Sequence, residues 1–162
     1  MKLISHRGNI SSKQPSFENS PSYIREALAA GYSVEADFWY KDNQWFLGHD
    51  EPEYKVNEIE WYLFNLNMFM HAKDIPTFIK MKEMQIEYAQ SSEMPVIVAH
   101  FFYHTSEPVI FTSRGMLWAH PKVEVPSEYA CAVMPEYAGW DKYKVEQVGF
   151  GAVCSDKIES FQ

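Results

Sequence analysis

The sequence predicts one α/β domain over residues 1–162, a compact (β/α)8 TIM-type barrel in which several outer helices are shortened or missing. About eight apolar runs have the length of strands, and in the first half they alternate with helical segments, as in a parallel sheet with right-handed crossovers. Polar residues follow these runs, at the strand ends where barrel active sites lie. The chain is shorter than the roughly 200 residues usual for such barrels, which the missing helices would explain. An open α/β sheet is the alternative.

The first half of the chain alternates strands and helices. Ser20 and Asp74 are expected to cap helices, because each precedes a first turn that contains proline, and Gly31 is expected to end the first of these helices. The expected order is a strand at 2–5, a polar loop at 7–21, a helix from Ser20-Pro21 through Ala30, a strand at 32–38 that returns as a hairpin at 44–47, a helix near 56–65, a strand at 68–72 and a helix from Asp74-Ile75-Pro76 to about Gln90.

The second half is expected to hold fewer helices. The run at 95–99 is apolar throughout, which is typical of a buried parallel strand. Short strands are expected at 109–111, 116–118 and 130–134, followed by a candidate helix at 137–148 and a last strand at 151–154.

Composition narrows the function classes. The chain has 14 basic and 22 acidic residues, a formal net charge of −8, and its basic residues form no run. A nucleic-acid partner is not expected, because binding a phosphate backbone requires a basic stripe. A phosphate-bearing ligand must instead be attracted by a local group of cations.

The two cysteines, Cys131 and Cys154, show no metal-binding spacing and are expected to be reduced core residues. Together with the lack of a signal peptide or a membrane-spanning run, they predict a cytoplasmic protein.

Pairs of polar residues recur where apolar runs end. Residues two apart on a strand point to the same side. Glu35 and Asp37 therefore share one face of their strand, and so do His71 and Lys73 on theirs. Two acids, several imidazoles and two cations together indicate a site for a metal ion and a phosphate. The pairs are His6 with Arg7, Glu35 with Asp37, His49 with Asp50, and His71 with Lys73.

Over residues 3–50, four ordered elements resemble the glycerophosphodiester phosphodiesterases, phospholipase C-like barrels that act on deacylated phospholipids. The family begins with His-Arg-Gly after a strand and continues with a Pro-Glu-Asn-Thr-like element, Glu-x-Asp and His-Asp. Here Phe17 replaces the proline and Ser20 the threonine, and a later Glu-x-Lys element reads His71-Ala72-Lys73. The matching elements are His6-Arg7-Gly8, Phe17-Glu18-Asn19-Ser20, Glu35-Ala36-Asp37 and His49-Asp50.

The resemblance implies metal-dependent hydrolysis of a glycerophosphodiester, or a similar small phosphodiester, to glycerol 3-phosphate and an alcohol. By this resemblance His6 and His49 are the general acid and base, and Arg7 and Lys73 hold the phosphate. One divalent ion, magnesium or calcium in this family, is bound by Glu35, Asp37 and His71. The imidazole in this set favours manganese, cobalt or zinc more than a third carboxylate would.

Two other functions are alternatives. One is a catalytically weak phosphate-binding or surface-polysaccharide accessory protein that retains the pocket. The other is a zinc hydrolase, which requires at least three imidazoles on one metal. No motif specifies the leaving alcohol or the oligomeric state, and five residues that follow later runs have no assigned role: His100, His104, His120, Glu136 and Asp156.

Overall fold

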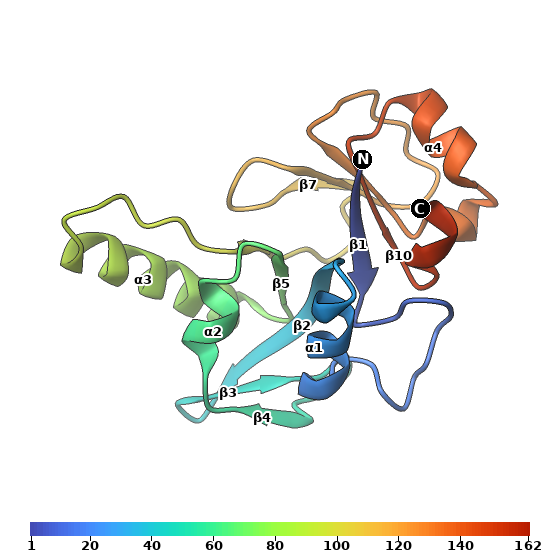
Figure 1. Cartoon of the computed structure of the whole chain (residues 1–162). Helices are drawn as coiled ribbons and strands as arrows, with labels where there is room; N and C mark the ends of the chain where they lie inside the picture. The colour runs from blue at the N-terminus through green and yellow to red at the C-terminus, as the bar shows by residue number, and fades with distance from the viewer.

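The computed structural model describes all 162 residues and contains one mixed, curled β-sheet with four α-helices (Figure 1). The strands are β1 (Lys2–His6), β2 (Ser33–Lys41), β3 (Gln44–Leu47), β4 (Tyr54–Val56), β5 (Met68–Ala72), β6 (His100–Phe102), β7 (Val109–Phe111), β8 (Leu117–Ala119), β9 (Ala130–Val133) and β10 (Ala152–Ser155). The helices are α1 (Pro21–Ala29), α2 (Ile59–Leu63), α3 (Ile75–Ser91) and α4 (Lys142–Val148), with 3₁₀ turns η1 (Pro135–Ala138) and η2 (Ile158–Phe161).

The predicted (β/α)8 barrel is wrong. The strands follow the order β4-β3-β2-β1-β10-β9-β8-β7, and β5 and β6 branch from β2. Parallel pairing joins β8, β9, β10, β1, β2, β5 and β6, but β3, β4 and β7 pair antiparallel to their neighbours. No strand ladder joins β6 to β7, so the sheet is a curled half-barrel and not a closed ring.

The short second half accounts for this difference. No helix lies between β6 and β9, and β8 reaches its parallel neighbour β9 through an irregular segment at 120–129. Two hydrogen bonds hold the open edges together just beyond β7. Ser113 N–H donates to the carbonyl oxygen of Phe101 at 2.8 Å, and Phe101 N–H donates to Ser113 Oγ at 3.0 Å.

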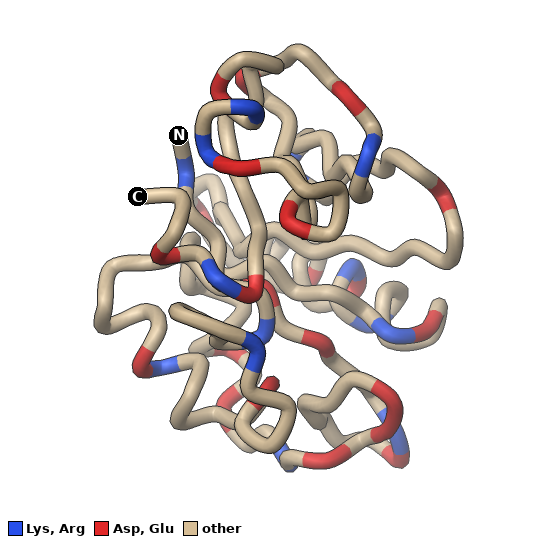
Figure 2. The backbone as a smooth tube through the Cα atoms, turned by 90° about the vertical axis from the view of Figure 1, so that its right-hand side faces the viewer, with Lys and Arg blue, Asp and Glu red and all other residues tan.

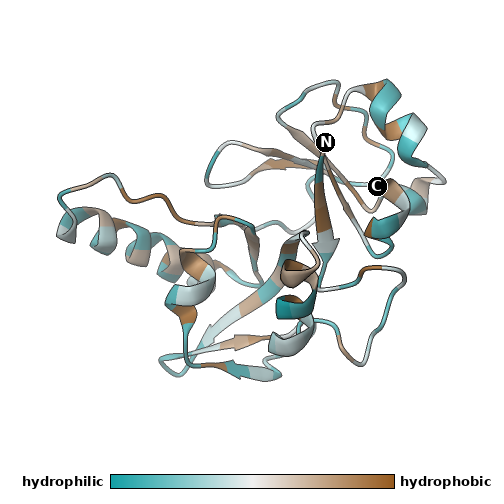
Figure 3. Ribbon diagram, in the orientation of Figure 1, coloured by the Kyte–Doolittle hydropathy of each residue, from teal (hydrophilic) through white to brown (hydrophobic).

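Alternation along the strands separates an inner face of the sheet from an outer face. Residues such as Val34 and Met70 point outward and pack under α1, α2 and α3, and a second outer cluster lies beneath α4 and η2. The inner cluster contains Phe102 from β6 and Trp118 from β8, whose ring centroids are 4.8 Å apart. Contact between strands from the two ends of the sheet shows that it curls around this cluster, and Figure 3 shows apolar residues along strands such as β1.

The predicted helix starts are confirmed by hydrogen bonds. Ser20 Oγ accepts a hydrogen bond from Tyr23 N–H, and Asp74 Oδ1 accepts one from Thr77 N–H at 2.8 Å. The strand at 68–72 and the hairpin return at 44–47 are also found at the predicted residues. No helix is both long and apolar enough to cross a membrane. Both cysteines are buried free thiols.

Three predicted elements are wrong in detail. The segment near 56–65 begins as strand β4, because it pairs with β3, and only Ile59–Leu63 is helical. The apolar run at 95–99 is irregular, with Ile97 exposed, and the strand starts at His100, where pairing with Phe69 begins. The helix predicted at 137–148 is divided into η1 and α4, because Gly139 adopts φ +73° and Asp141 caps a new helix.

Candidate functional site

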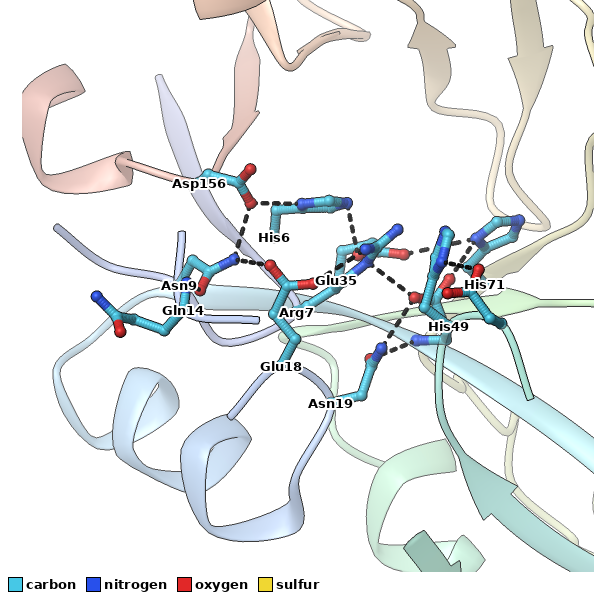
Figure 4. A network of polar contacts seen from close by, with 12 residues as sticks. His6, Arg7, Asn9, Gln14, Glu18, Asn19, Glu35, His49, His71 and Asp156 are labelled. Carbon is cyan, nitrogen blue, oxygen red and sulfur yellow. Dashed lines mark hydrogen bonds and ion pairs between the residues drawn. The ribbon is translucent and has the colours of Figure 1, made fainter. Parts of the chain in front are cut away.

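The carboxyl ends of the parallel strands meet at a cavity of about 520 Å³, the place where α/β sheets usually bind ligands (Figure 4). Of the seven predicted site residues, six line this cavity, and Asp37 lies fully buried against them. Figure 2 shows lysines and arginines spread among acidic residues over the chain. Three of these cations, Arg7, Lys13 and Lys73, line the cavity. The six lining residues are His6, Arg7, Glu35, His49, His71 and Lys73.

Glu35 is a buried carboxylate without adequate compensation. Its side chain points inward from β2 and is 2% exposed, and Oε2 has no hydrogen-bond partner. The nearest imidazole nitrogens are His6 Nε2, 3.8 Å from Oε2, and His71 Nδ1, 3.7 Å from Oε1. Burial and the adjacent charge of Asp37 raise the pKa of Glu35. This unpartnered oxygen is available to a cation.

Asp37, two residues further along β2, is compensated by cations and hydrogen-bond donors. Oδ1 lies 2.8 Å from His71 Nδ1 and 3.3 Å from Lys73 Nζ, and Oδ2 lies 2.9 Å from Arg7 Nε. Asn19 donates to Oδ2 at 2.9 Å and accepts from the Asp37 backbone N–H at the same distance. Burial acts to raise the pKa of Asp37, but the bond to His71 and the charges of Arg7 and Lys73 hold it far below its usual value.

His71 completes the only group of three or more potential metal ligands in the structure. One ligand atom each from Glu35, Asp37 and His71 lie within 4.8 Å of one another. Two carboxylates, one imidazole and the unpartnered Glu35 oxygen fit a divalent cation. The zinc-hydrolase alternative fits poorly, because this group contains a single imidazole.

His6 is oriented by the far end of the chain. Its Nδ1 lies 2.7 Å from Asp156 Oδ1, directly after β10, and Nε2 points toward Glu35. Asn9 Nδ2 and Tyr137 Oη donate to the same Asp156 carboxylate at 2.8 and 3.1 Å. Burial acts to lower the pKa of His6, but the hydrogen bond to Asp156 and the charge of Glu35 outweigh it and raise the pKa.

His49 lies on the other, more open side of the cavity. The turn after β3 carries it, and its Nδ1 lies 2.7 Å from the exposed Asp50 carboxylate. Its side chain is 42% exposed, against 14% for His6. Partial burial and the positive charge of Arg7 lower the pKa of His49. The two imidazoles are therefore shifted in opposite directions.

Arg7 is positioned by an unusual backbone after β1. Arg7 and Gly8 have φ values of +55° and +94°, and a Cβ on Gly8 would lie 2.6 Å from the Tyr23 ring, so only glycine fits there. Glu18 Oε2 accepts from Arg7 Nη1 at 3.0 Å, and Glu18 Oε1 accepts from Asn9 at 2.9 Å. Glu18 therefore orders the first loop around the guanidinium.

Several residues without a predicted role lie at or near the site. Asn19 contacts Asp37 directly, and its place in the Phe17–Ser20 element could have identified it. Asp156 and Asn9 are separated by most of the chain, so no local pattern links them. Glu136 accepts from Ser155 Oγ at 2.7 Å and from Asp156 N–H at 3.0 Å, which orders the strand end that carries Asp156.

The remaining histidines divide between structure and cavity. His100 Nδ1 lies 2.9 Å from Thr112 Oγ1 and its ring stacks on Phe69, so it packs within the fold. His104 and His120 line the cavity. Burial, followed by neighbouring imidazoles, lowers the pKa of His104 to about 4.

Comparison of the chain with models of protein families, with curated proteins and with solved structures finds no match.

Proposed function

We propose that the protein is a metal-dependent phosphodiesterase that acts on a glycerophosphodiester or a similar small phosphodiester. The observation that carries this proposal is the meeting of three potential metal ligands, two imidazoles and two cations at one cavity. A phosphodiester is an anion that repels nucleophiles, so its cleavage depends on charge neutralisation and proton transfer. The resemblance of residues 3–50 to glycerophosphodiester phosphodiesterases supports the same assignment.

Glu35, Asp37 and His71 would hold the divalent ion. When bound, it would act as a Lewis acid and neutralise charge on the phosphate. The unpartnered Glu35 oxygen supports this role, since a cation there would compensate a buried acceptor that has no hydrogen-bond partner in the protein. Arg7 and Lys73, already paired with Asp37, would share their remaining donors with the phosphoryl oxygens.

His6 and His49 would transfer the protons. In the first step the glycerol hydroxyl next to the phosphate forms a new P–O bond, and the bond to the leaving alcohol breaks. One imidazole takes the proton of the attacking hydroxyl, and the other gives a proton to the leaving oxygen. The opposite pKa shifts favour neutral His49 as the base and protonated His6 as the acid. Water then opens the cyclic phosphate to glycerol 3-phosphate, with the two roles reversed.

One observation favours a second candidate, a phosphate-binding accessory protein. Both oxygens of Asp37 already have partners within the protein, so its charge is neutralised without an ion. A cavity with paired cations could hold a phosphate group while turning it over poorly.

Turnover measurements separate the two candidates. Purified protein is stripped with a chelator and assayed on glycerophosphocholine, glycerophosphoinositol and bis(p-nitrophenyl) phosphate, with and without added magnesium, calcium or manganese. The phosphodiesterase proposal expects metal-restored cleavage that Glu35→Gln abolishes and Glu83→Gln, an exposed change on α3, leaves intact. Phosphate binding without metal-dependent turnover of any of these substrates would favour the accessory protein.

A further inference from the structure

Beyond the acid cluster, three imidazoles form a continuous wall of the cavity. His71 belongs to β5, His104 follows β6 and His120 follows β8. The rings of His71 and His104 stack with centroids 4.5 Å apart and planes 4° apart, and the rings of His104 and His120 meet edge to face, also at 4.5 Å. Because His71 is already assigned to the metal, the term imidazole wall is used below for His104 and His120 only.

Packing alone does not explain the imidazole wall. His104 Nδ1 and His120 Nε2 are buried without a hydrogen-bond partner, which destabilises a fold. Phenylalanine at either position would keep an aromatic ring for stacking and remove the unpaired nitrogen. The opposite nitrogens, His104 Nε2 and His120 Nδ1, form no hydrogen bond within the protein and are not buried. Both side chains line the cavity, and each ring therefore has one accessible nitrogen without a partner in the protein.

The charges around the cavity limit what can bind there. Arg7, Lys13 and Lys73 line it, and its only carboxylate is Glu35, which the proposed function assigns to the metal. A quaternary ammonium or amine on the leaving group would meet these cations without an opposing acid. A hydroxyl suits a neutral imidazole better, because the ring carries one donor and one acceptor.

We propose that the alcohol esterified to the phosphate is an uncharged, hydroxyl-rich ring such as a cyclitol or a sugar, and that the imidazole wall binds its hydroxyls. This inference rests on the proposed function for the position of the phosphate, beside Arg7 and Lys73. Tyr137 lies on the same cavity and offers an aromatic face for the apolar side of such a ring.

A neighbouring depression is the other place where the leaving group could lie. It shares Arg7, Lys13 and His49 with the cavity, but its other lining is mostly acidic and includes Asp50, Glu51 and Glu53. A cationic headgroup would bind on that acidic side. The two directions predict opposite ligand preferences and depend on different residues.

Calorimetric titration of the manganese-loaded protein with myo-inositol 1-phosphate and with phosphocholine tests the inference. We expect myo-inositol 1-phosphate to bind at least about tenfold more tightly, as one or two hydroxyl–imidazole hydrogen bonds would provide. His104→Phe and His120→Phe should each lower this preference about three- to tenfold, since they keep the ring but lose the nitrogens. His104→Gln should retain part of the preference, and the double variant Glu51→Gln/Glu53→Gln should leave the affinity for myo-inositol 1-phosphate unchanged.

Three results would overturn the inference: equal or tighter binding of phosphocholine, a preference insensitive to both phenylalanine variants, or no measurable binding of either phosphate. Because the readout is binding, it is separate from turnover. If the preference holds and no phosphodiester is cleaved, the imidazole wall stands and the enzyme assignment falls. If bis(p-nitrophenyl) phosphate is cleaved and the preference is absent, the enzyme assignment stands alone.

Discussion

Replacing Glu35 by glutamine should stabilise the metal-free protein. The side chain is buried, its Oε2 has no hydrogen-bond partner, and the nearest imidazole nitrogens lie 3.7 and 3.8 Å away, beyond hydrogen-bond distance. An unsatisfied buried acceptor costs about 1–3 kcal/mol, and more when charged. Glutamine keeps the volume and removes the charge, so we expect the free energy of unfolding to rise by about 1–2 kcal/mol. For a chain of this size that corresponds to a Tm increase of about 2–8 °C.

A divalent ion should reverse this order of stability. Wild-type protein with an ion at 100 times its Kd gains about 2.7 kcal/mol, whereas the variant, lacking a ligand, should gain little. Thermal melts in chelator and in manganese measure both effects. A Glu35→Gln protein that melts below wild type in chelator, or that gains as much from manganese as wild type does, would refute the reasoning.

The pH dependence of this difference follows from the raised pKa of Glu35. Burial and Asp37 raise the pKa above its ordinary 4.5, so the native state holds this proton more tightly than the unfolded state does. The resulting stabilisation of wild type is complete below pH 4.5 and is lost as the pH rises through the raised pKa. The advantage of Glu35→Gln should therefore grow from acid to neutral pH. An advantage that shrinks over this range would contradict the assignment.

Three further variants test neighbouring parts of the site. Asp37→Asn, two residues from Glu35, should act in the opposite direction and destabilise the protein by about 3–5 kcal/mol, because it leaves buried cations unpaired. A denaturant titration measures this change, and an unchanged unfolding midpoint would contradict it. Asp156→Asn should lower the pKa of His6 and move the alkaline limb of the pH–rate profile to lower pH, whereas an unmoved limb would remove Asp156 from the positioning of His6. His49→Ala should reduce kcat by about 10²–10⁴-fold and leave the Tm near that of wild type, since His49 is partly exposed; near-normal turnover would exclude it as a proton donor or acceptor.

Local patterns were enough to predict the position of the acidic cluster. Strand periodicity places Glu35 and Asp37 on one face of β2, and β2 pairs with β5 so that Asp37 lies opposite His71. The caps at Ser20 and Asp74 are likewise local, since each side chain bonds a backbone N–H three residues later. The caps depend on residues close in sequence, and the acidic cluster depends on strand periodicity and on the pairing of β2 with β5.

The errors arise where tertiary pairing outweighs local pattern. The apolar run at 95–99 has the composition of a buried strand, but the partner strand β5 offers its pairing positions to His100–Phe102. The closed barrel was inferred from the number of strands, their alternation with helices in the first half and the polar residues that follow them, and the sequence gives no direct sign that β7 would run antiparallel to β8. The contact between His6 and Asp156 spans 150 positions, which no periodicity within one element can reveal.

The central claim is that Glu35, Asp37 and His71 hold one divalent ion at the carboxyl ends of the parallel strands. Anomalous diffraction from crystals grown with manganese tests it most directly. The account predicts one strong anomalous peak, from a manganese ion that is bonded to oxygens of Glu35 and Asp37 and to a ring nitrogen of His71. A peak elsewhere on the molecule, or none at a manganese concentration that saturates the thermal shift, would contradict it.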